Sequence, residues 1–279
     1  MSSTEQRIGF IGDGQMGLPM LQRLVASGRE VVAFARRGEA RAQCEAMGAR
    51  STDDPQKAVR DATAVVVCLF DDAQIRELAL GPSGFLGSMA LQALLVVHTT
   101  GSPAMSRELA AQGSDREIRV VDAPVSGSAQ DIEQGHVTVF LGGDSNDIET
   151  ATALVAAYGD SILPIGPLGS AMAVKLLNNA LFAAHVQLAG EVERVAAGFD
   201  VEMSTVASAI LLGSGSSYAM SVVARYGSLA AVSDAAGPFL AKDVAAVHEV
   251  AAELGLNLGV LGHVNDHGPI TFAPRKVSD

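Results

Sequence analysis

The sequence predicts an α/β fold in which an amino-terminal, doubly wound parallel sheet is followed by an all-helical carboxyl-terminal part. Up to residue 166, short apolar runs alternate with amphipathic stretches, a pattern typical of parallel strands joined by right-handed helical crossovers. Beyond residue 166 the apolar stretches become long and rich in alanine and leucine, which favours helices. We therefore expect two domains, at residues 1–166 and 167–279.

The predicted strands of the first domain are its short apolar runs, at Ile8–Ile11, Val31–Phe34, Ala64–Phe70, Leu94–His98, Ile118–Asp122, Val137–Leu141 and Ile162–Ile165. The predicted helices between them lie at Met16–Ala26, Gly38–Met47, Asp72–Leu80, Pro103–Gln112 and Ser145–Tyr158. Pro103 fits the first turn of its helix, because proline is favoured there.

A single long helix is predicted for Leu168–Phe199, which contains no proline and one interior glycine, Gly190. It is apolar nearly all round, so we expect it to be buried on several sides. Its length of about 45 Å is typical of a helix that joins two lobes or two subunits. Further helices are predicted at Val201–Leu212, Ser217–Arg225 and Lys242–Leu254. The polar stretch after Gly262, with Pro269 and Pro274, predicts an extended or loosely ordered tail.

Composition and charge narrow the possible functions. Of the 279 residues, 48% are hydrophobic and 18% are charged, as in a packed globular protein. The net charge of −12 argues against binding to nucleic acid or to an anionic membrane. Cys44 and Cys68 lack the spacing of a zinc or redox motif, so we expect no metal and a reducing cytoplasm. Met1–Arg7 lacks the features of a secretory signal, and no apolar run reaches the ~18 residues of a membrane span.

The strongest local signal is the run Gly12-Asp13-Gly14-Gln15-Met16-Gly17, directly after the first predicted strand. The first glycine permits a tight turn, the second lets a pyrophosphate approach the backbone, and the third lets the next helix pack closely. The start of that helix favours phosphate through its N–H groups and its dipole. Strand, motif and helix together predict a Rossmann dinucleotide-binding domain; the alternative is a glycine-rich turn without a ligand.

The predicted cofactor is NADP rather than NAD. In NAD enzymes an acidic residue about 20 residues after the first glycine bonds the ribose 2′-hydroxyl. Here that place reads Ala35-Arg36-Arg37, and the next acidic residue is Glu39. Two guanidinium groups suit a 2′-phosphate, which a carboxylate would repel. The alternative is that both arginines only form a solvated start to a helix.

Lys175, Asn178 and Asn179 are candidates for chemistry on the long predicted helix, where their spacing places them on one side. Such groups are costly to bury without partners, and ligand clefts tend to lie at lobe boundaries. A lysine can donate a proton to a carbonyl oxygen that is receiving hydride. Burial lowers the pKa of a lysine and a substrate carboxylate raises it. The alternative is that the three residues only bond a neighbouring loop or a wet interface.

The segment Asp122–Ser128 follows a predicted strand and is rich in small and hydroxyl residues. Its backbone N–H and side-chain O–H groups can bind a carboxylate. The same composition is also that of an ordinary turn, so these residues alone favour neither interpretation.

Together these segments resemble the β-hydroxyacid dehydrogenase family, which includes 3-hydroxyisobutyrate dehydrogenases and tartronate semialdehyde reductases. The resemblance extends from Ile8 to Leu256. The family's motifs are matched, in chain order, by Gly9–Met20, by Asp122–Gly127 with Gly135, Gly142 and Gly143, by Gly166, Gly169, Lys175, Asn178 and Asn179, and by Phe239, Lys242 and Asp243.

The resemblance implies hydride transfer between nicotinamide C4 and the carbon of a short β-hydroxy acid or its semialdehyde, with Lys175 as general acid/base and Asn179 orienting the substrate. It implies substrate binding by Ser126, Gly127, Ser128 and Asn178. It implies cofactor binding by Gly12, Gly14, Gln15, Met16, Gly17, Arg36, Arg37, Leu69, Phe70, Thr100 and Lys242. It also makes the long helix an interface, so we expect a homodimer or homotetramer.

The chain departs from the family pattern at several places. Ser128 and Ile132 stand where a glycine and a small residue are usual, and Phe70 where proline is common. Gly262–Gly268 replaces the usual closing helix and its glycine-and-aspartate motif. Two alternatives remain. Imine reductases share the architecture but usually lack a lysine at the position of Lys175, and a non-catalytic nucleotide sensor has no need of one.

Overall fold

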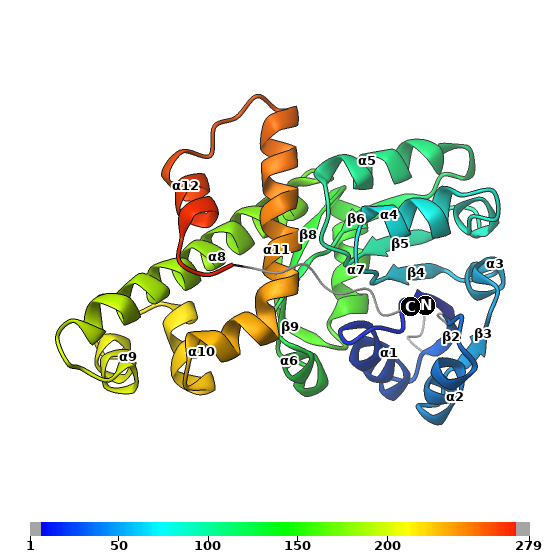
Figure 1. The fold of residues 1–279 in the computed structure, drawn as a ribbon. Coiled ribbons are helices and arrows are strands. Elements are labelled where there is room, and N and C mark those ends of the chain that lie inside the picture. The colour runs from blue at the N-terminus through cyan, green and yellow to red at the C-terminus, as the bar shows by residue number, and fades with distance from the viewer. Residues whose placement is uncertain (1–6, 272–279) are drawn as a thin grey trace. The chain divides into compact units, whose positions relative to one another are not determined.

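The computed structural model describes residues 7–271 of the chain and divides it into two compact units, Met1–Lys175 and Leu176–Asp279. The division falls inside one long helix, α8 (Ser170–Ala197). An α/β unit is followed by an all-α unit, so the predicted fold class is confirmed (Figure 1).

The first unit contains one sheet with the strand order β3-β2-β1-β4-β5-β6-β8-β7, and β9 pairs with β8. The strands are β1 (Arg7–Ile11), β2 (Glu30–Phe34), β3 (Arg50–Thr52), β4 (Ala64–Val67), β5 (Leu94–Val97), β6 (Arg119–Asp122), β7 (Val125–Ser126), β8 (Val137–Gly142) and β9 (Gly159–Gly166). All pairs from β3 to β6 are parallel, whereas β8 runs antiparallel to β6 and β7. The strand order reverses direction between β1 and β4, and such a switch point is where dinucleotides bind in open α/β sheets.

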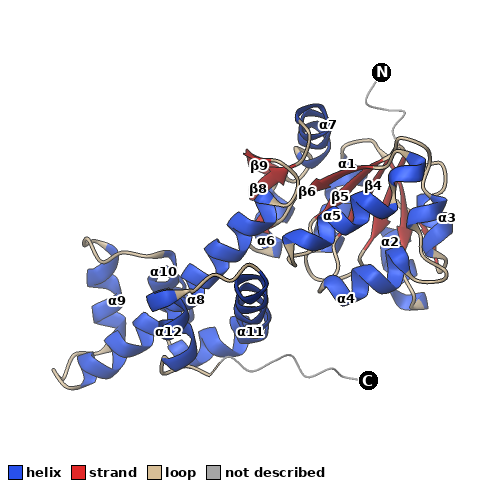
Figure 2. Cartoon of the chain, turned by 90° about the horizontal axis from the view of Figure 1, so that it is seen from above, coloured by secondary structure: helices blue, strands red, loops and turns tan. Residues whose placement is uncertain are grey.

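Helices cover both faces of this sheet, as Figure 2 shows. They are α1 (Gly17–Ala26), α2 (Gly38–Ala46), α3 (Pro55–Val59), α4 (Asp72–Ile75), α5 (Pro103–Gln112), α6 (Ala129–Gln134) and α7 (Ser145–Val155). Successive residues of β1 explain the two layers, because side chains alternate between the faces of a strand. Phe10 packs in a cluster with residues of α1, α2, α6 and α7, whereas Ile11 packs with residues of α3, α4 and α5.

Several predicted boundaries in this unit were wrong. The third strand stops at Val67 rather than Phe70, because the next residues form a loop. The helix predicted at Asp72–Leu80 is α4 followed by a π-helical turn, Arg76–Leu80. The short elements β3, α3, β7 and α6 were not predicted, since two to six residues carry too little periodicity.

The second unit contains the rest of α8 with α9 (Met203–Leu211), α10 (Tyr218–Tyr226), α11 (Leu229–Glu253) and α12 (Gly259–His267). Its main apolar cluster joins Ala183 and Val186 of α8 to Val223 of α10 and Val232 of α11. Helix α11 begins 13 residues before the predicted start at Lys242. Helix α11 continues through Gly237 and Pro238, and Leu240 packs in the same cluster.

The carboxyl-terminal prediction needs the clearest correction. The stretch after Gly262 is not an extended tail, because α12 continues to His267. Asn265 donates from Nδ2 to the Ala180 carbonyl at 3.1 Å, and Gln187 bonds both the N–H and the carbonyl of Ile270. A Cβ on Gly190 would lie 2.7 Å from Pro269, so this glycine of α8 gives the proline room. Pro274 lies outside the described residues.

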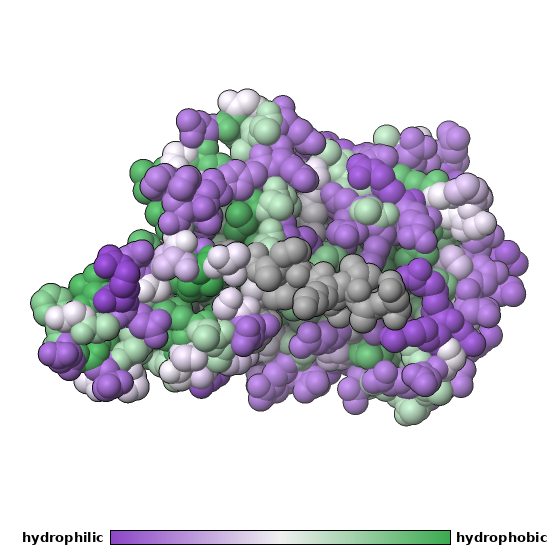
Figure 3. Space-filling view, viewed as in Figure 1, coloured by the Kyte–Doolittle hydropathy of each residue, from purple (hydrophilic) through white to green (hydrophobic). Residues whose placement is uncertain are grey.

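Exposed hydrophobic side chains are distributed unevenly between the units. Among the described residues, Leu91 and Leu163 are the large exposed hydrophobics of the first unit, and all the others belong to the second. Figure 3 shows hydrophobic residues among polar ones on the surface of the helical unit. Much of α8 is buried, as Ala180, Ala183 and Val186 are, but Leu181, Leu188 and Val195 are 46–49% exposed and form an uncovered apolar stripe in the single chain. Within residues 7–271, no helix reaches the combined length and apolarity needed to cross a membrane.

Candidate active site

The turn after β1 has the shape that its three glycines predicted. Gly12 has φ +137°, and a Cβ there would lie 2.1 Å from the Cys68 carbonyl oxygen. A Cβ on Gly17 would lie 2.2 Å from the Gly12 oxygen, so α1 packs closely on this turn. A Cβ on Gly14 would meet open space. No side chain caps the N–H groups at the start of α1, next to Gln15 and Met16. This turn therefore fits a pyrophosphate group.

The two arginines after β2 lie on the surface at the start of α2. Both Arg36 and Arg37 are exposed, and Arg36 Nη1 lies 4.0 Å from Glu77 Oε1. A third arginine, which the sequence analysis did not single out, holds their backbone in place. Arg41 donates from Nη1 to the carbonyls of Ala35 at 3.2 Å and Arg36 at 2.9 Å. The exposed ion pair with Glu77 is weak, so Arg36 is available to an anionic ligand.

The loop after β4, which carries Leu69 and Phe70, is fixed by two side chains. The Leu69 N–H donates to Thr99 Oγ1 at 2.8 Å, and the Phe70 N–H donates to Gln74 Oε1 at 3.1 Å. Thr99 belongs to the loop after β5, so this bond joins the two loops.

A second contact joins the same two loops through Asp72, the first residue of α4. Asp72 Oδ2 accepts a hydrogen bond from the Ser102 N–H at 2.8 Å. A Cβ on Gly101 would lie 1.8 Å from Asp72 Oδ1, so any other residue at Gly101 would push the two loops apart. Thr100 lies between these anchored positions. Thr100 was predicted as a site residue and Asp72 was not, because Asp72 and Ser102 lie 30 residues apart and no local pattern links them.

Behind these loops lies a buried polar pair. His98 directly follows β5, and its Nδ1 bonds the Ala123 carbonyl while its Nε2 lies 2.7 Å from the Tyr158 hydroxyl. Since a carbonyl only accepts, Nδ1 carries the proton and Nε2 accepts from Tyr158. Burial lowers the pKa of His98 to about 4, against the opposing effect of the Ala123 carbonyl. His98 is therefore neutral at physiological pH and joins the ends of β5 and β6.

The segment predicted to bind a carboxylate forms a strand and a helix cap. Ser126 lies in β7 and pairs with Thr138, and Gly127 has φ +144°. Ser128 caps α6: its Oγ accepts from the Asp131 N–H at 3.2 Å, and Asp131 Oδ2 accepts from the Ser128 N–H at 2.6 Å. The Ser128 hydroxyl is thus engaged in local structure, whereas Gly127 is exposed.

Lys175 lies in the second turn of α8 and is the last residue of the first unit. It is 9% exposed. The helix that carries it begins just after Gly169, whose φ is +93°. The carboxylate of Asp122 accepts hydrogen bonds from the N–H groups of Gly169 and Met172, each at 2.7 Å. Burial raises the pKa of Asp122, and these N–H groups act in the opposite direction.

The other predicted polar residues meet in the second unit around Asp243. Asn178 donates from Nδ2 to Asn179 Oδ1 at 3.0 Å, and Asn179 donates from its own Nδ2 to Asp243 Oδ2. Lys242 Nζ lies 3.4 Å from Asp243 Oδ1. Asp243 is 6% exposed, so it is a buried acceptor for both neighbours. Asp243 was recognised in the sequence as part of a family motif, without a role of its own.

The predicted site residues thus fall into two groups. The glycine turn, Arg36, Thr100, Ser126 and Lys175 belong to the first unit, and Asn178, Asn179 and Lys242 belong to the second. In the part of the chain that the structure describes, no cluster of three or more His, Cys, Asp or Glu side chains has the arrangement of a metal site.

Comparison with known proteins identifies both parts of the chain. Residues 7–166 match the family model described as the NAD binding domain of 6-phosphogluconate dehydrogenase. Residues 169–267 match the model described as the NAD-binding domain of NADP-dependent 3-hydroxyisobutyrate dehydrogenase.

Relatives and solved structures agree with these matches. An uncharacterized oxidoreductase of Shewanella frigidimarina is 35% identical over 65% of this chain and 62% of its own length, so the chain spans less than two thirds of that relative. A protein of Pseudomonas aeruginosa named NAD-dependent L-serine dehydrogenase is 31% identical over 78% of this chain and 73% of its own. The structure titled Mycobacterium tuberculosis 3-hydroxyisobutyrate dehydrogenase with L-serine has a TM-score of 0.85 at 22% identity, covers 96% of both chains, and shows the shared fold.

The glycine turn after β1, the buried lysine on α8 and the matches over both units lead to one assignment. The chain belongs to the β-hydroxyacid dehydrogenase family of the 3-hydroxyisobutyrate dehydrogenase type.

Proposed function

We propose that this chain is an NADP-dependent dehydrogenase of short β-hydroxy acids and their semialdehydes. The observation that carries the proposal is the nearly buried Lys175, which lies in the same unit as a glycine turn open to a pyrophosphate. A lysine is costly to bury, and a buried ionisable group is therefore a candidate for a functional residue. Proton transfer to a substrate oxygen is such a function.

In the proposed reaction, Gly12, Gly14 and Gly17 with the start of α1 hold the pyrophosphate of the cofactor. The cofactor, when bound, supplies or accepts the hydride at its nicotinamide. Lys175 donates a proton to the carbonyl oxygen when the semialdehyde is reduced, and it accepts the hydroxyl proton in the opposite direction. Ser126, through its hydroxyl, and Gly127, through its backbone N–H, bind the substrate carboxylate.

The remaining predicted residues have supporting roles in this proposal. Asn179 orients the substrate, and its amide is itself held by Asp243 and Asn178. Leu69, Phe70 and Thr100 lie in loops anchored to each other and flank the nicotinamide. Lys242, which belongs to the second unit, is proposed as a further cofactor-binding residue on the family resemblance.

The preference for NADP rests on charge at the end of β2. Arg36 and Arg37 are exposed there, and Arg41 holds the backbone that carries them. The relative from Pseudomonas aeruginosa is named as NAD-dependent, so the choice of cofactor needs measurement in this chain. We expect NADPH to bind at least tenfold more tightly than NADH, because charge-assisted bonds to a 2′-phosphate are strong.

We further propose that residues 1–166 form the cofactor-binding domain and 167–279 a domain for substrate binding and assembly, and that the protein is a homodimer. The support for assembly is the exposed stripe of Leu181, Leu188 and Val195, spaced seven residues apart on α8. An apolar stripe with that period is typical of helix–helix contacts. Light scattering of wild type and Leu188→Glu measures this, and a monomeric wild type contradicts it.

The function is tested by following absorbance of the reduced cofactor with NADP or NAD and a panel of β-hydroxy acids and semialdehydes. Lys175→Ala is compared with Lys57→Ala, which removes an exposed lysine. Loss of Lys175 is expected to lower kcat about 100- to 10,000-fold, the usual contribution of a general acid. NADPH binding, measured by fluorescence, stays unchanged in both variants.

Two results would contradict the proposal. Equal activity of wild type and Lys175→Ala removes the lysine from the chemistry. Cofactor binding without turnover of any acid or semialdehyde excludes the substrate class, and the same assay with cyclic imines then tests the imine reductase alternative.

A further inference from the structure

The carboxylate of Asp122 has no role in the proposed chemistry, yet with an exposure of 0% it is the most completely buried acid among residues 7–175. It stands at the last residue of β6, and each of its oxygens accepts a backbone N–H from the start of α8. The two bonds come from Gly169 and Met172 and are each 2.7 Å long, the length of strong charge-assisted bonds.

This contact ties α8 to the sheet. The first N–H groups of a helix have no partners within it, and a negative charge at this end is also favoured by the helix dipole. Neutral capping residues elsewhere in the unit, such as Ser102, accept only one such N–H from their own helix. Asp122 instead reaches α8 from a strand 47 residues earlier in the chain.

The space around the carboxylate is closed from a third side. A Cβ on Gly142, at the end of β8, would lie 2.4 Å from Asp122 Oδ1 and 3.0 Å from the Ala171 N–H. The carboxylate therefore fits between β6, β8 and the first turn of α8, and a shift in any one of them moves the others.

We propose that Asp122 is the positioning residue for Lys175. Lys175 follows Met172 by three residues of α8, an advance of about 4.5 Å along the helix. Because the Met172 N–H is bonded to Asp122, the carboxylate fixes the position of α8 along its axis and its rotation about that axis, and so fixes where Lys175 lies. This inference rests on the proposed role of Lys175, although the geometric part of it is independent of catalysis.

The first test is the nearly isosteric variant Asp122→Asn. Its amide oxygen accepts one of the two N–H groups, but its NH2 group faces the other, so the first turn of α8 shifts. We expect kcat to fall about 30- to 100-fold, as a displacement near 1 Å does. KM and the Kd for NADPH are expected to stay within about threefold, since neither Ser126 and Gly127 nor the glycine turn is altered. Asp54→Asn is the matched control, because Asp54 also accepts two backbone N–H groups, at the start of α3.

The second test does not depend on turnover. Wild type and variants are treated with an acylating reagent for amines at one pH, and the labelling rate of Lys175 is followed by mass spectrometry. The exposed Lys57 in the same sample is the internal standard. A changed position of α8 is expected to change the labelling rate of Lys175 by at least threefold in Asp122→Asn and to leave Lys57 unchanged.

A third variant perturbs the same contact from β8, and it keeps the inference testable if Asp122→Asn does not fold. Gly142→Ala pushes on the carboxylate and should change both kcat and Lys175 labelling in the same direction. Gly87→Ala is its control, since a Cβ at Gly87 meets open space. Unchanged labelling and unchanged kcat in both variants would overturn the inference. If wild type turns over no hydroxy acid, the proposed function fails, and the labelling of Lys175 still decides the role of Asp122.

Discussion

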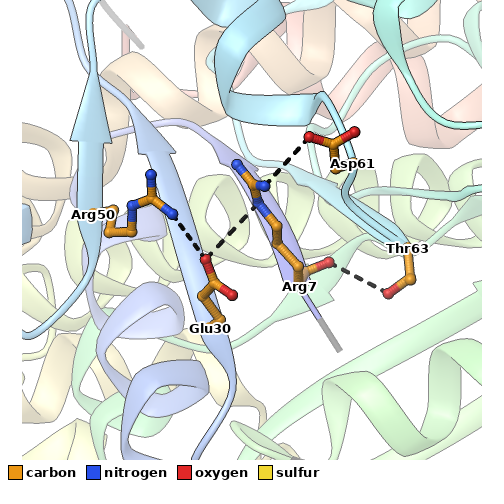
Figure 4. Close-up of polar contacts among 5 residues, drawn as sticks. All are labelled: Arg7, Glu30, Arg50, Asp61 and Thr63. Atoms are coloured by element: carbon orange, nitrogen blue, oxygen red, sulfur yellow. Dashed lines mark hydrogen bonds and ion pairs between the residues drawn. The ribbon is translucent and has the colours of Figure 1, made fainter. Parts of the chain in front are cut away.

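The two edges of the parallel sheet are held together by different kinds of polar contact. At the amino ends of the strands, charged side chains pair with each other across the surface, as Figure 4 shows. Arg7 lies between Glu30 and Asp61, and Arg50 lies 3.1 Å from Glu30. At the carboxyl ends, side chains bond to backbone groups of neighbouring segments: Asp122 and His98 are buried, and Asp72 is partly buried.

The two kinds of contact differ in the free energy that is lost when one of them breaks. Exposed ion pairs gain little in water and tolerate small movements. A buried acceptor that loses its N–H partner is left unsatisfied, at a cost of about 1–3 kcal/mol. Displacing a segment at the carboxyl ends of the strands therefore costs more free energy than moving an exposed ion pair at their amino ends.

The largest expected effect at the carboxyl edge is the response of His98 to acid. Its pKa lies at about 4 in the folded chain and at 6.5 as an ordinary histidine. As pH falls, this histidine therefore binds a proton in the unfolded chain at a higher pH than in the folded chain. Above pH 6.5 it is neutral in both states, and the free energy of unfolding is not reduced by its protonation. Each pH unit between 6.5 and about 4 is expected to lower the free energy of unfolding by about 1.4 kcal/mol.

Urea unfolding of wild type and His98→Gln between pH 7 and pH 4.5 measures this effect. The variant should be less stable at pH 7 and should lose less stability on acidification. His136→Gln is the control, because His136 forms an exposed pair with Asp160. Parallel pH profiles for wild type and His98→Gln would show that the buried pair does not control acid stability.

These long-range bonds mark the limit of what the sequence could predict. The longer strands, the glycine turn and α5 follow from patterns within about ten residues, so they were predicted. Asp122 and Gly169 lie 47 residues apart, and His98 and Tyr158 lie 60 apart, with no local pattern that links them. The same reason explains α12, whose Asn265 is polar in sequence but buried against the Ala180 carbonyl of α8. Local sequence patterns therefore predict the candidate site residues, and tertiary hydrogen bonds determine how the segments that carry them are held.

A smaller effect is expected where Gly101 meets Asp72. Gly101→Ala places a methyl group where the Asp72 carboxylate lies, so the loops after β4 and β5 must separate. We expect kcat/KM to fall about tenfold, or about 1.4 kcal/mol of transition-state stabilisation. Asp72→Ala is expected to cost a similar amount, because the Ser102 N–H loses its acceptor. The loss of transition-state stabilisation in the double variant should be smaller than the sum of the two single losses, because the methyl group at position 101 no longer meets a carboxylate. Strict additivity in this double-mutant cycle would show that the two residues act separately.

The smallest effect is expected at the amino edge, where Glu30 contacts both Arg7 and Arg50. Glu30→Gln removes both ion pairs and keeps the size of the side chain. Because all three side chains are partly exposed, the free energy of unfolding should fall by less than about 1 kcal/mol. Added salt should reduce the difference from wild type, since it screens exposed charges. Turnover should be unchanged, because the edge that carries the candidate site lies at the other end of the strands. A loss of 2 kcal/mol or more, or a fall in kcat, would mean that the two edges are coupled through the sheet.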